Sequence, residues 1–138
     1  MIKNVNLGEE IAIATKNKVG LLADISTMLA NEGVNIEAAL GYESGKTARL
    51  MLVTNSNLTI VSKLKRKKYK SVKEAEVVIV EIENKPGALK VVTTELRKKK
   101  IDIKYLYVTP PCGCASSKMV LQTSDNETAM ALLNKFVE

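Results

Sequence analysis

The sequence contains no histidine and no tryptophan, and its 138 residues include one phenylalanine and two cysteines. Histidine is the commonest general base near neutral pH and the commonest nitrogen ligand of zinc, so the usual basis of a catalytic or metal site is missing. No apolar stretch approaches the roughly 18 residues of a membrane span, and Met1–Glu10 has no signal-peptide core. We therefore expect a cytoplasmic protein that is not an enzyme, with no catalytic residue, no cofactor and no metal.

The positive charge is concentrated in one short run. The net charge is +6, and six of the basic residues lie in Lys63–Lys70. Because this run contains no acidic residue, the rest of the chain is neutral overall. A run of this kind is usually the solvated end of a helix. We expect no nucleic acid and no membrane as partner.

The two cysteines, Cys112 and Cys114, lie too close together for a disulfide framework. Two thiols without a histidine supply only half of a tetrahedral zinc site. We interpret them as incidental thiols in a hairpin rich in proline and glycine.

The sequence repeats itself. Thr15–Leu22 returns as Ile82–Leu89, 67 positions later. At this offset the identical pairs are Asn17/Asn84, Lys18/Lys85, Gly20/Gly87, Leu22/Leu89, Thr27/Thr94, Leu29/Leu96 and Ile36/Ile103. A fixed period of this length indicates a duplicated structural unit.

Hydrophobic periodicity predicts the same order of elements in both copies. In the first copy it predicts strands at Glu10–Thr15, Val34–Leu40, Ala48–Thr54 and Tyr69–Val72, with helices from Leu22 and over Leu58–Lys67. In the second it predicts strands at Val77–Ile82, Ile101–Thr109 and Ser117–Thr123, with helices at Pro86–Lys99 and Asp125–Val137. This order is the ferredoxin-like βαββαβ plan. We predict an α+β protein of two such units side by side, residues 1–74 and 75–138, each an antiparallel sheet with both helices on one face.

The second copy has no counterpart of Tyr69–Val72, so its first strand lacks a neighbour. Unpaired backbone groups on a partly buried strand are costly, and we expect another segment to cover them. Either Met1–Leu7 crosses over to pair there, or Tyr69–Val80 is one long strand that serves both sheets.

The repeated turn after the first strand is the candidate binding element. Gly20 and Gly87 fall in the predicted first helical turn, where glycine costs about 1 kcal/mol relative to alanine. One interpretation is that glycine lets a carboxylate approach the free N–H groups at the positive end of the helix dipole. Asn17 and Asn84 can both donate and accept, and the lysine after each adds positive charge.

A purely structural interpretation of the turn stays open. Asparagine would then cap the helix, Pro86 would occupy the first turn as proline prefers, and glycine would allow close packing of strand and helix.

The turn residues closely resemble the opening of ACT domains, in which a strand runs into an (N/D)-(K/x)-P-G-x-L turn and a helix. Asn84–Leu89 followed by Ile101–Ile103 carries this resemblance. Asn17–Leu22 with Gly33–Ile36 is similar, with Val19 in place of the proline. The chain resembles a stand-alone tandem ACT protein.

The resemblance, which covers about residues 9–137, implies regulatory binding of a small molecule, typically an amino acid. It places the ligand between the turn of one unit and the second strand of its neighbour. The implied ligand-binding residues are Asn17, Lys18, Gly20, Leu21, Asn84, Pro86, Gly87 and Ala88 in the turns, and Asn35, Ile36, Asp102 and Ile103 at the strand starts.

Two other function classes compete with this one. An RNA binder with the same plan would stack bases on aromatics of its central strands, but Ala48–Thr54 and Ser117–Thr123 contain none. A module that only self-associates, without a ligand, remains the alternative. We expect a homodimer, because this topology leaves Val34–Leu40 and Ile101–Thr109 as open edge strands.

Overall fold

A computed structural model describes residues 1–109 and 116–138, so Cys112 and Cys114 lie outside the described part. The described chain forms two compact units. The first-repeat unit is Glu9–Ala75, and the second-repeat unit is Met1–Gly8 together with Glu76–Glu138. The predicted boundaries, residues 1–74 and 75–138, assign the first eight residues to the first repeat. In the structure these residues pack with the second repeat.

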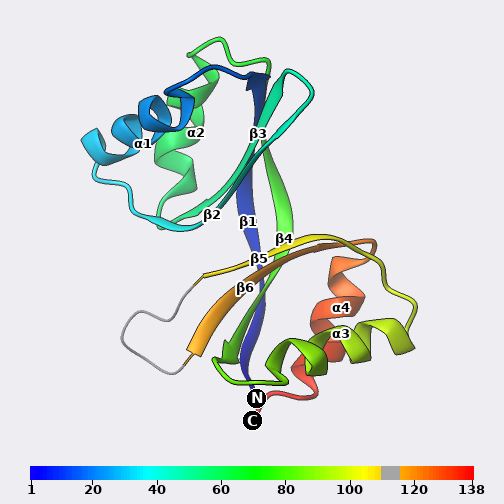
Figure 1. The fold of residues 1–138 in the computed structure, drawn as a ribbon. Coiled ribbons are helices and arrows are strands. Elements are labelled where there is room, and N and C mark those ends of the chain that lie inside the picture. The colour runs from blue at the N-terminus through cyan, green and yellow to red at the C-terminus, as the bar shows by residue number, and fades with distance from the viewer. Residues whose placement is uncertain (110–115) are drawn as a thin grey trace. The chain divides into compact units, whose positions relative to one another are not determined.

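The first-repeat unit follows the βαββαβ order along one continuous stretch of chain. Its elements are β1 (Ile2–Lys16, from Glu9 onward), α1 (Leu21–Asn31), β2 (Ile36–Ser44), β3 (Thr47–Thr54), α2 (Asn57–Lys65) and β4 (Ser71–Glu83, as far as Ala75). The strand order is β2-β3-β1-β4, and β3 pairs antiparallel with both β1 and β2. Figure 1 shows α1 and α2 on the same side of these strands.

The second-repeat unit has the same arrangement built from two pieces of chain. The rest of β4 is followed by α3 (Ala88–Lys98), β5 (Ile103–Val108), β6 (Ser116–Thr123) and α4 (Asn126–Asn134). Its strand order is β5-β6-β4-β1, so the beginning of β1 is its fourth strand. The α+β class and the ferredoxin-like plan are confirmed, and β2 and β5 are the outermost strands as predicted.

The N-terminal segment is an integral part of the second-repeat unit. Ile2 is fully buried and Val5 is 7% exposed, both in the core that α3 and α4 cover. The N–H of Glu83 donates to the carbonyl of Met1 (2.9 Å), and Ile2 forms a parallel bridge with Val137. Both suggested ways to cover the strand edge therefore occur, since β1 and β4 are each one long strand with residues in both units.

Each first helix buries one stripe against its own sheet. The stripe of α1 is Leu21, Ile25 and Leu29, and the stripe of α3 is Ala88, Val92 and Leu96. These four-residue steps place one helical face on the core. Among the helices of the described residues, none is long and apolar enough to cross a membrane.

A repeated asparagine fixes the start of the second helix in each unit. The Oδ1 of Asn57 accepts from the N–H (3.2 Å) and the hydroxyl (2.6 Å) of Thr54, and its Nδ2 donates to the carbonyl of Glu9 (3.0 Å). Asn126 makes the same bonds to Thr123 and Glu76. Each asparagine thus ties three segments of its unit together.

Candidate ligand-binding site

The glycine of each turn stands before the helix, not in its first turn. Gly20 is the N-cap of α1 with φ +89°, and Gly87 is the N-cap of α3 with φ +91°. Residues with a side chain rarely adopt this left-handed conformation, so the backbone alone calls for glycine here. The expectation that these glycines weaken a helical turn was wrong.

The asparagine of the first turn does not cap α1, for which no side-chain cap is found. The Nδ2 of Asn17 instead donates to the carboxylate of Glu43, and its backbone N–H donates to the carbonyl of Lys46 (2.8 Å). Both acceptors belong to the β2–β3 hairpin, so Asn17 holds the turn against the hairpin.

Two N–H groups at the start of α1 have no acceptor among the described residues. The N–H of Leu21 donates to Lys18 (3.3 Å) and that of Asp24 to Gly20 (2.9 Å). For Leu22 and Ala23, no acceptor is found within residues 1–109 and 116–138. Such groups at a helix N-terminus attract negative charge.

A cavity of about 260 Å³, here called the turn cavity, lies between this turn and the hairpin. Its lining is Asn17, Lys18, Gly20, Leu21, Leu22, Gly41, Tyr42, Ala48 and Leu50. The structure therefore brings together the four turn residues named from the first copy. Sequence reasoning missed the five other lining residues. Gly41 could have been found, because a glycine inside a strand often marks a place where a ligand or another backbone comes close.

The second turn has different surroundings. A side-chain carbon placed on Gly87 would lie 3.6 Å from the Cε of Met1, whereas Gly20 has nothing within 4 Å. Lys85 pairs with Glu83 (2.5 Å), and Lys3 lies 3.3 Å from the same carboxylate. Hydrogen bonds from these two lysines lower the pKa of Glu83 to about 2.

The remaining second-turn residues fall into two groups. Asn84 and Pro86 are exposed, whereas Ala88 is buried in the core. Contact of Ala88 with a ligand stays a prediction, and in this structure its side chain packs with the core residues.

The predicted strand-start residues do not line the turn cavity. The N–H of Asn35 donates to the side chain of Asn55 (2.9 Å), and that of Asp102 donates to the hydroxyl of Ser124 (3.0 Å). These residues follow the C-termini of α1 and α3, and an 11-residue helix is about 16 Å long. Within one unit, turn and strand start therefore cannot contact the same small molecule.

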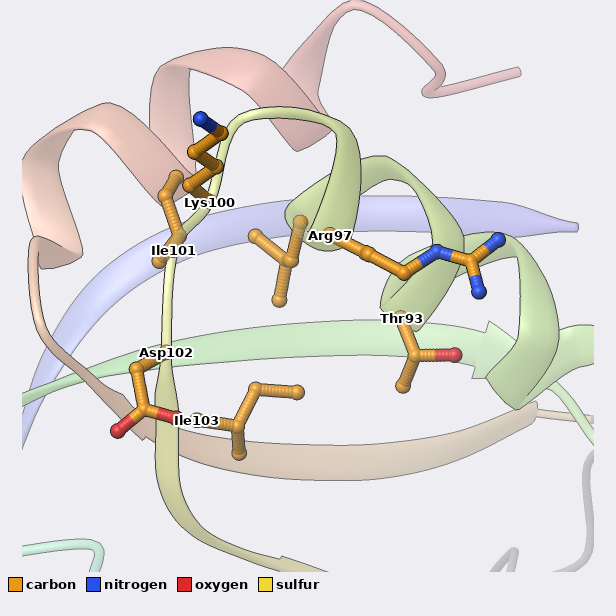
Figure 2. Close-up of a pocket in the computed structure, with 7 residues that line it drawn as sticks. Thr93, Arg97, Lys100, Ile101, Asp102 and Ile103 are labelled. Carbon is orange, nitrogen blue, oxygen red and sulfur yellow. The ribbon is translucent and has the colours of Figure 1, made fainter.

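Asp102 and Ile103 line a separate cavity of about 520 Å³, shown in Figure 2. This cavity lies between the end of α3 and the start of β5. Its other lining residues are Thr93, Leu96, Arg97, Lys100 and Ile101. In the view of Figure 2, Arg97 and Asp102 point away from each other. The described residues show no ion pair between them.

A third cavity, of about 510 Å³, lies along the exposed side of α1. Lys18 and Asp24 line it and pair with each other (3.4 Å). Burial raises the pKa of Tyr69 on its far wall. The charge of Lys18 is thus partly engaged and not wholly directed at the turn cavity.

Residues 11–71 match the family model of the ACT domain. The first repeat is an ACT domain. The turn cavity lies within this ACT domain, and the second-repeat unit has the same strand order and helix placement.

Solved structures similar to the chain share its fold over nearly its whole length. A protein from Bacteroides thetaiotaomicron is 23% identical with a TM-score of 0.86, covering 96% of this chain and 90% of that one. The ligand-free regulatory subunit of aspartate kinase from Thermus thermophilus is 12% identical with a TM-score of 0.65, covering 99% of each chain. No curated protein sequence matches the chain.

Proposed function

We propose that this protein is a regulatory module that binds a small molecule, an α-amino acid, at the strand–helix turn of its ACT domain. The observation that carries the proposal is the turn cavity, because it joins free helix N–H groups to an apolar hollow. Its volume of about 260 Å³ is just below the range of roughly 300–1,000 Å³ typical of drug-sized ligands, which suits a metabolite as small as an amino acid.

Asn17 and Leu22 of the lining, with Ala23 and Glu43 next to lining residues in sequence, provide for both ends of an amino acid. The N–H groups of Leu22 and Ala23 would donate hydrogen bonds to the carboxylate. The Oδ1 of Asn17 and the carboxylate of Glu43 are acceptors for the ammonium. The regulatory role is supported by the ACT family and by the fold shared with the aspartate kinase regulatory subunit.

Self-association belongs to the same proposal. The edge strands β2 and β5 carry exposed apolar side chains, with Tyr42 48% and Val108 46% exposed. An open edge of this kind is a template for pairing with another chain. A homodimer would bring a second copy to these edges, and sedimentation at micromolar concentration measures it.

A thermal-shift screen of the standard amino acids tests the ligand. A compound that binds only the folded state at about 100 times its Kd stabilises it by about 2.7 kcal/mol, a shift of several degrees. The confirming variant is the double change Leu22→Glu and Leu89→Glu. Both leucines are the second residue of their helix and are about half exposed, at 52% and 45%.

Glutamate at this helix position is compatible with the fold, because a negative charge in the first turn favours the dipole. It would repel a carboxylate at the same N–H groups. The matched control is Leu58→Glu, the same change at the second residue of α2, where the leucine is 86% exposed. We expect the shift to vanish in the double variant and persist in the control. A screen without any hit would contradict the proposal.

A further inference from the structure

The two turns share a sequence motif but differ in what stands opposite them. In the first-repeat unit, Gly41 pairs with Leu50 across β2 and β3. In the second-repeat unit, Val108 pairs with Met119 across β5 and β6. Leu50 and Met119 both belong to the helix-side cores, and cross-strand partners share a face. Gly41 and Val108 are therefore equivalent positions on the helix side of their sheets.

Gly41 keeps the turn cavity open. A side-chain carbon at this position would lie only 2.8 Å from the Cδ2 of Leu50, and both residues line the cavity. The equivalent position in the second-repeat unit carries the isopropyl group of Val108. The second-repeat unit thus has a branched side chain at the position where the first has no side chain at all.

The space around the turn glycine is also more open in the first repeat than in the second. Nothing lies within 4 Å of a side-chain carbon on Gly20, whereas the thioether methyl of Met1 lies 3.6 Å from one on Gly87. The N-terminal segment that completes the second sheet therefore also contacts the second turn at Gly87.

The charges differ as well. The residue before the turn asparagine is Lys16 in the first repeat and Glu83 in the second. Glu83 stays ionised because Lys85 and Lys3 bond to it. The ion pairs with Glu83 engage both Lys85 and Lys3 beside the second turn, whereas Lys16 adds a positive charge beside the first.

From these differences we infer that the first-repeat turn alone is the binding site, and that it takes an α-amino acid with an apolar side chain. This inference rests on the proposed function and adds to it the copy that binds and the ligand class. The apolar preference follows from the lining, in which Leu21, Leu22, Ala48 and Leu50 surround the hollow opened by Gly41.

Titration calorimetry of the full chain with L-leucine and L-methionine tests the inference. Isoamylamine, which is leucine without its carboxylate, serves as the ligand control. The protein variants are Leu22→Glu, Leu89→Glu and Leu58→Glu, one identical change at the second residue of three helices. Gly41→Val is an independent variant that fills the cavity without altering its charge.

We expect one L-leucine or L-methionine per chain and no binding of isoamylamine. Leu22→Glu and Gly41→Val should each weaken binding by about tenfold or more, whereas Leu89→Glu and Leu58→Glu should leave it unchanged. Thermal unfolding of each variant shows that it is folded.

Other outcomes separate the two claims. Loss of binding in Leu89→Glu, or two ligands per chain, would overturn the single-site inference and leave the proposed function standing. Binding restricted to polar or charged amino acids would overturn the ligand class alone. Absence of binding for every amino acid would overturn both.

Discussion

The first-repeat unit takes its fourth strand from the residues that follow its second helix, whereas the second-repeat unit takes its own from the start of the chain. The same fold is thus closed by a local segment in one case and by a distant one in the other. The distant segment brings Met1 and Lys3 to the second turn, while the first turn faces an open cavity. The two repeats therefore share a fold, but the different origins of their fourth strands give the two turns different neighbours.

Shortening one apolar side chain in the fourth strand of each unit should give the largest difference in stability between the units. Ile2 is fully buried, and Ile2→Ala should cost about 2–5 kcal/mol of unfolding free energy through lost burial and the cavity left behind. Val72 is only partly buried in its core, so Val72→Ala should cost about 1 kcal/mol. Urea unfolding followed by circular dichroism measures both. Equal losses would show that the N-terminal strand is no more essential than its counterpart.

Removing the repeated asparagine should destabilise both units, and the second more. Asn57→Ala removes the acceptor of the Thr54 N–H and hydroxyl and the donor to the Glu9 carbonyl, at a cost of about 1–3 kcal/mol. Asn126 donates one further hydrogen bond, to the side chain of Gln122 (2.9 Å). Asn126→Ala should therefore lower the free energy of unfolding more than Asn57→Ala does. Hydrogen exchange of β3 and β6 amides reports each unit separately. A larger loss in Asn57→Ala would contradict this order.

Substituting the turn glycines should cost similar amounts in both units. Gly20→Ala and Gly87→Ala each place a side chain at a φ near +90°, a strain of about 1–2 kcal/mol. The contact with Met1, at 3.6 Å, is an ordinary one and adds no clash. Thermal melts compare the two. If Gly20→Ala were neutral, the left-handed backbone would not explain the repeated glycine.

The smallest effect should appear only in acid. The pKa of Glu83 is lowered from 4.5 to about 2 in the folded protein, so its contribution is present above about pH 4.5 and is lost as the pH falls towards 2. Glu83→Gln should flatten the fall in stability over this window and change little at pH 7 beyond a constant offset. Melting temperatures measured from pH 6 to pH 2 would show it. Parallel curves for the two proteins would contradict the prediction.

Local patterns predicted most of the fold. The helices predicted from Leu22 and at Asp125–Val137 are α1 and α4, and the N-cap of α4 is Asp125, which accepts from the N–H of Thr128 (3.1 Å). These features depend on neighbours a few residues away. The full length of β1 was not predicted, because Ile2 and Val5 are three residues apart and show no strand alternation.

The candidate site was also predicted only in part, because only some of its features are local in the sequence. The turn residues Asn17 and Gly20 were identified because they repeat. The left-handed φ of Gly20 and the role of Gly41 depend on backbone conformation and strand register, which no single-sequence pattern specifies. The strand-start residues came from the family resemblance alone, and their part in binding stays a prediction.

The bridge between Ile2 and Val137 joins two pieces of the second-repeat unit that are far apart in the sequence. During synthesis, Glu9–Ala75 leaves the ribosome as one stretch and can fold as soon as it is complete. Met1–Gly8 is made before this stretch, but the segment with which it packs, Glu76–Glu138, is made after it. Its apolar side chains, Ile2 and Val5 among them, can therefore be buried only when residues of the second repeat have left the ribosome.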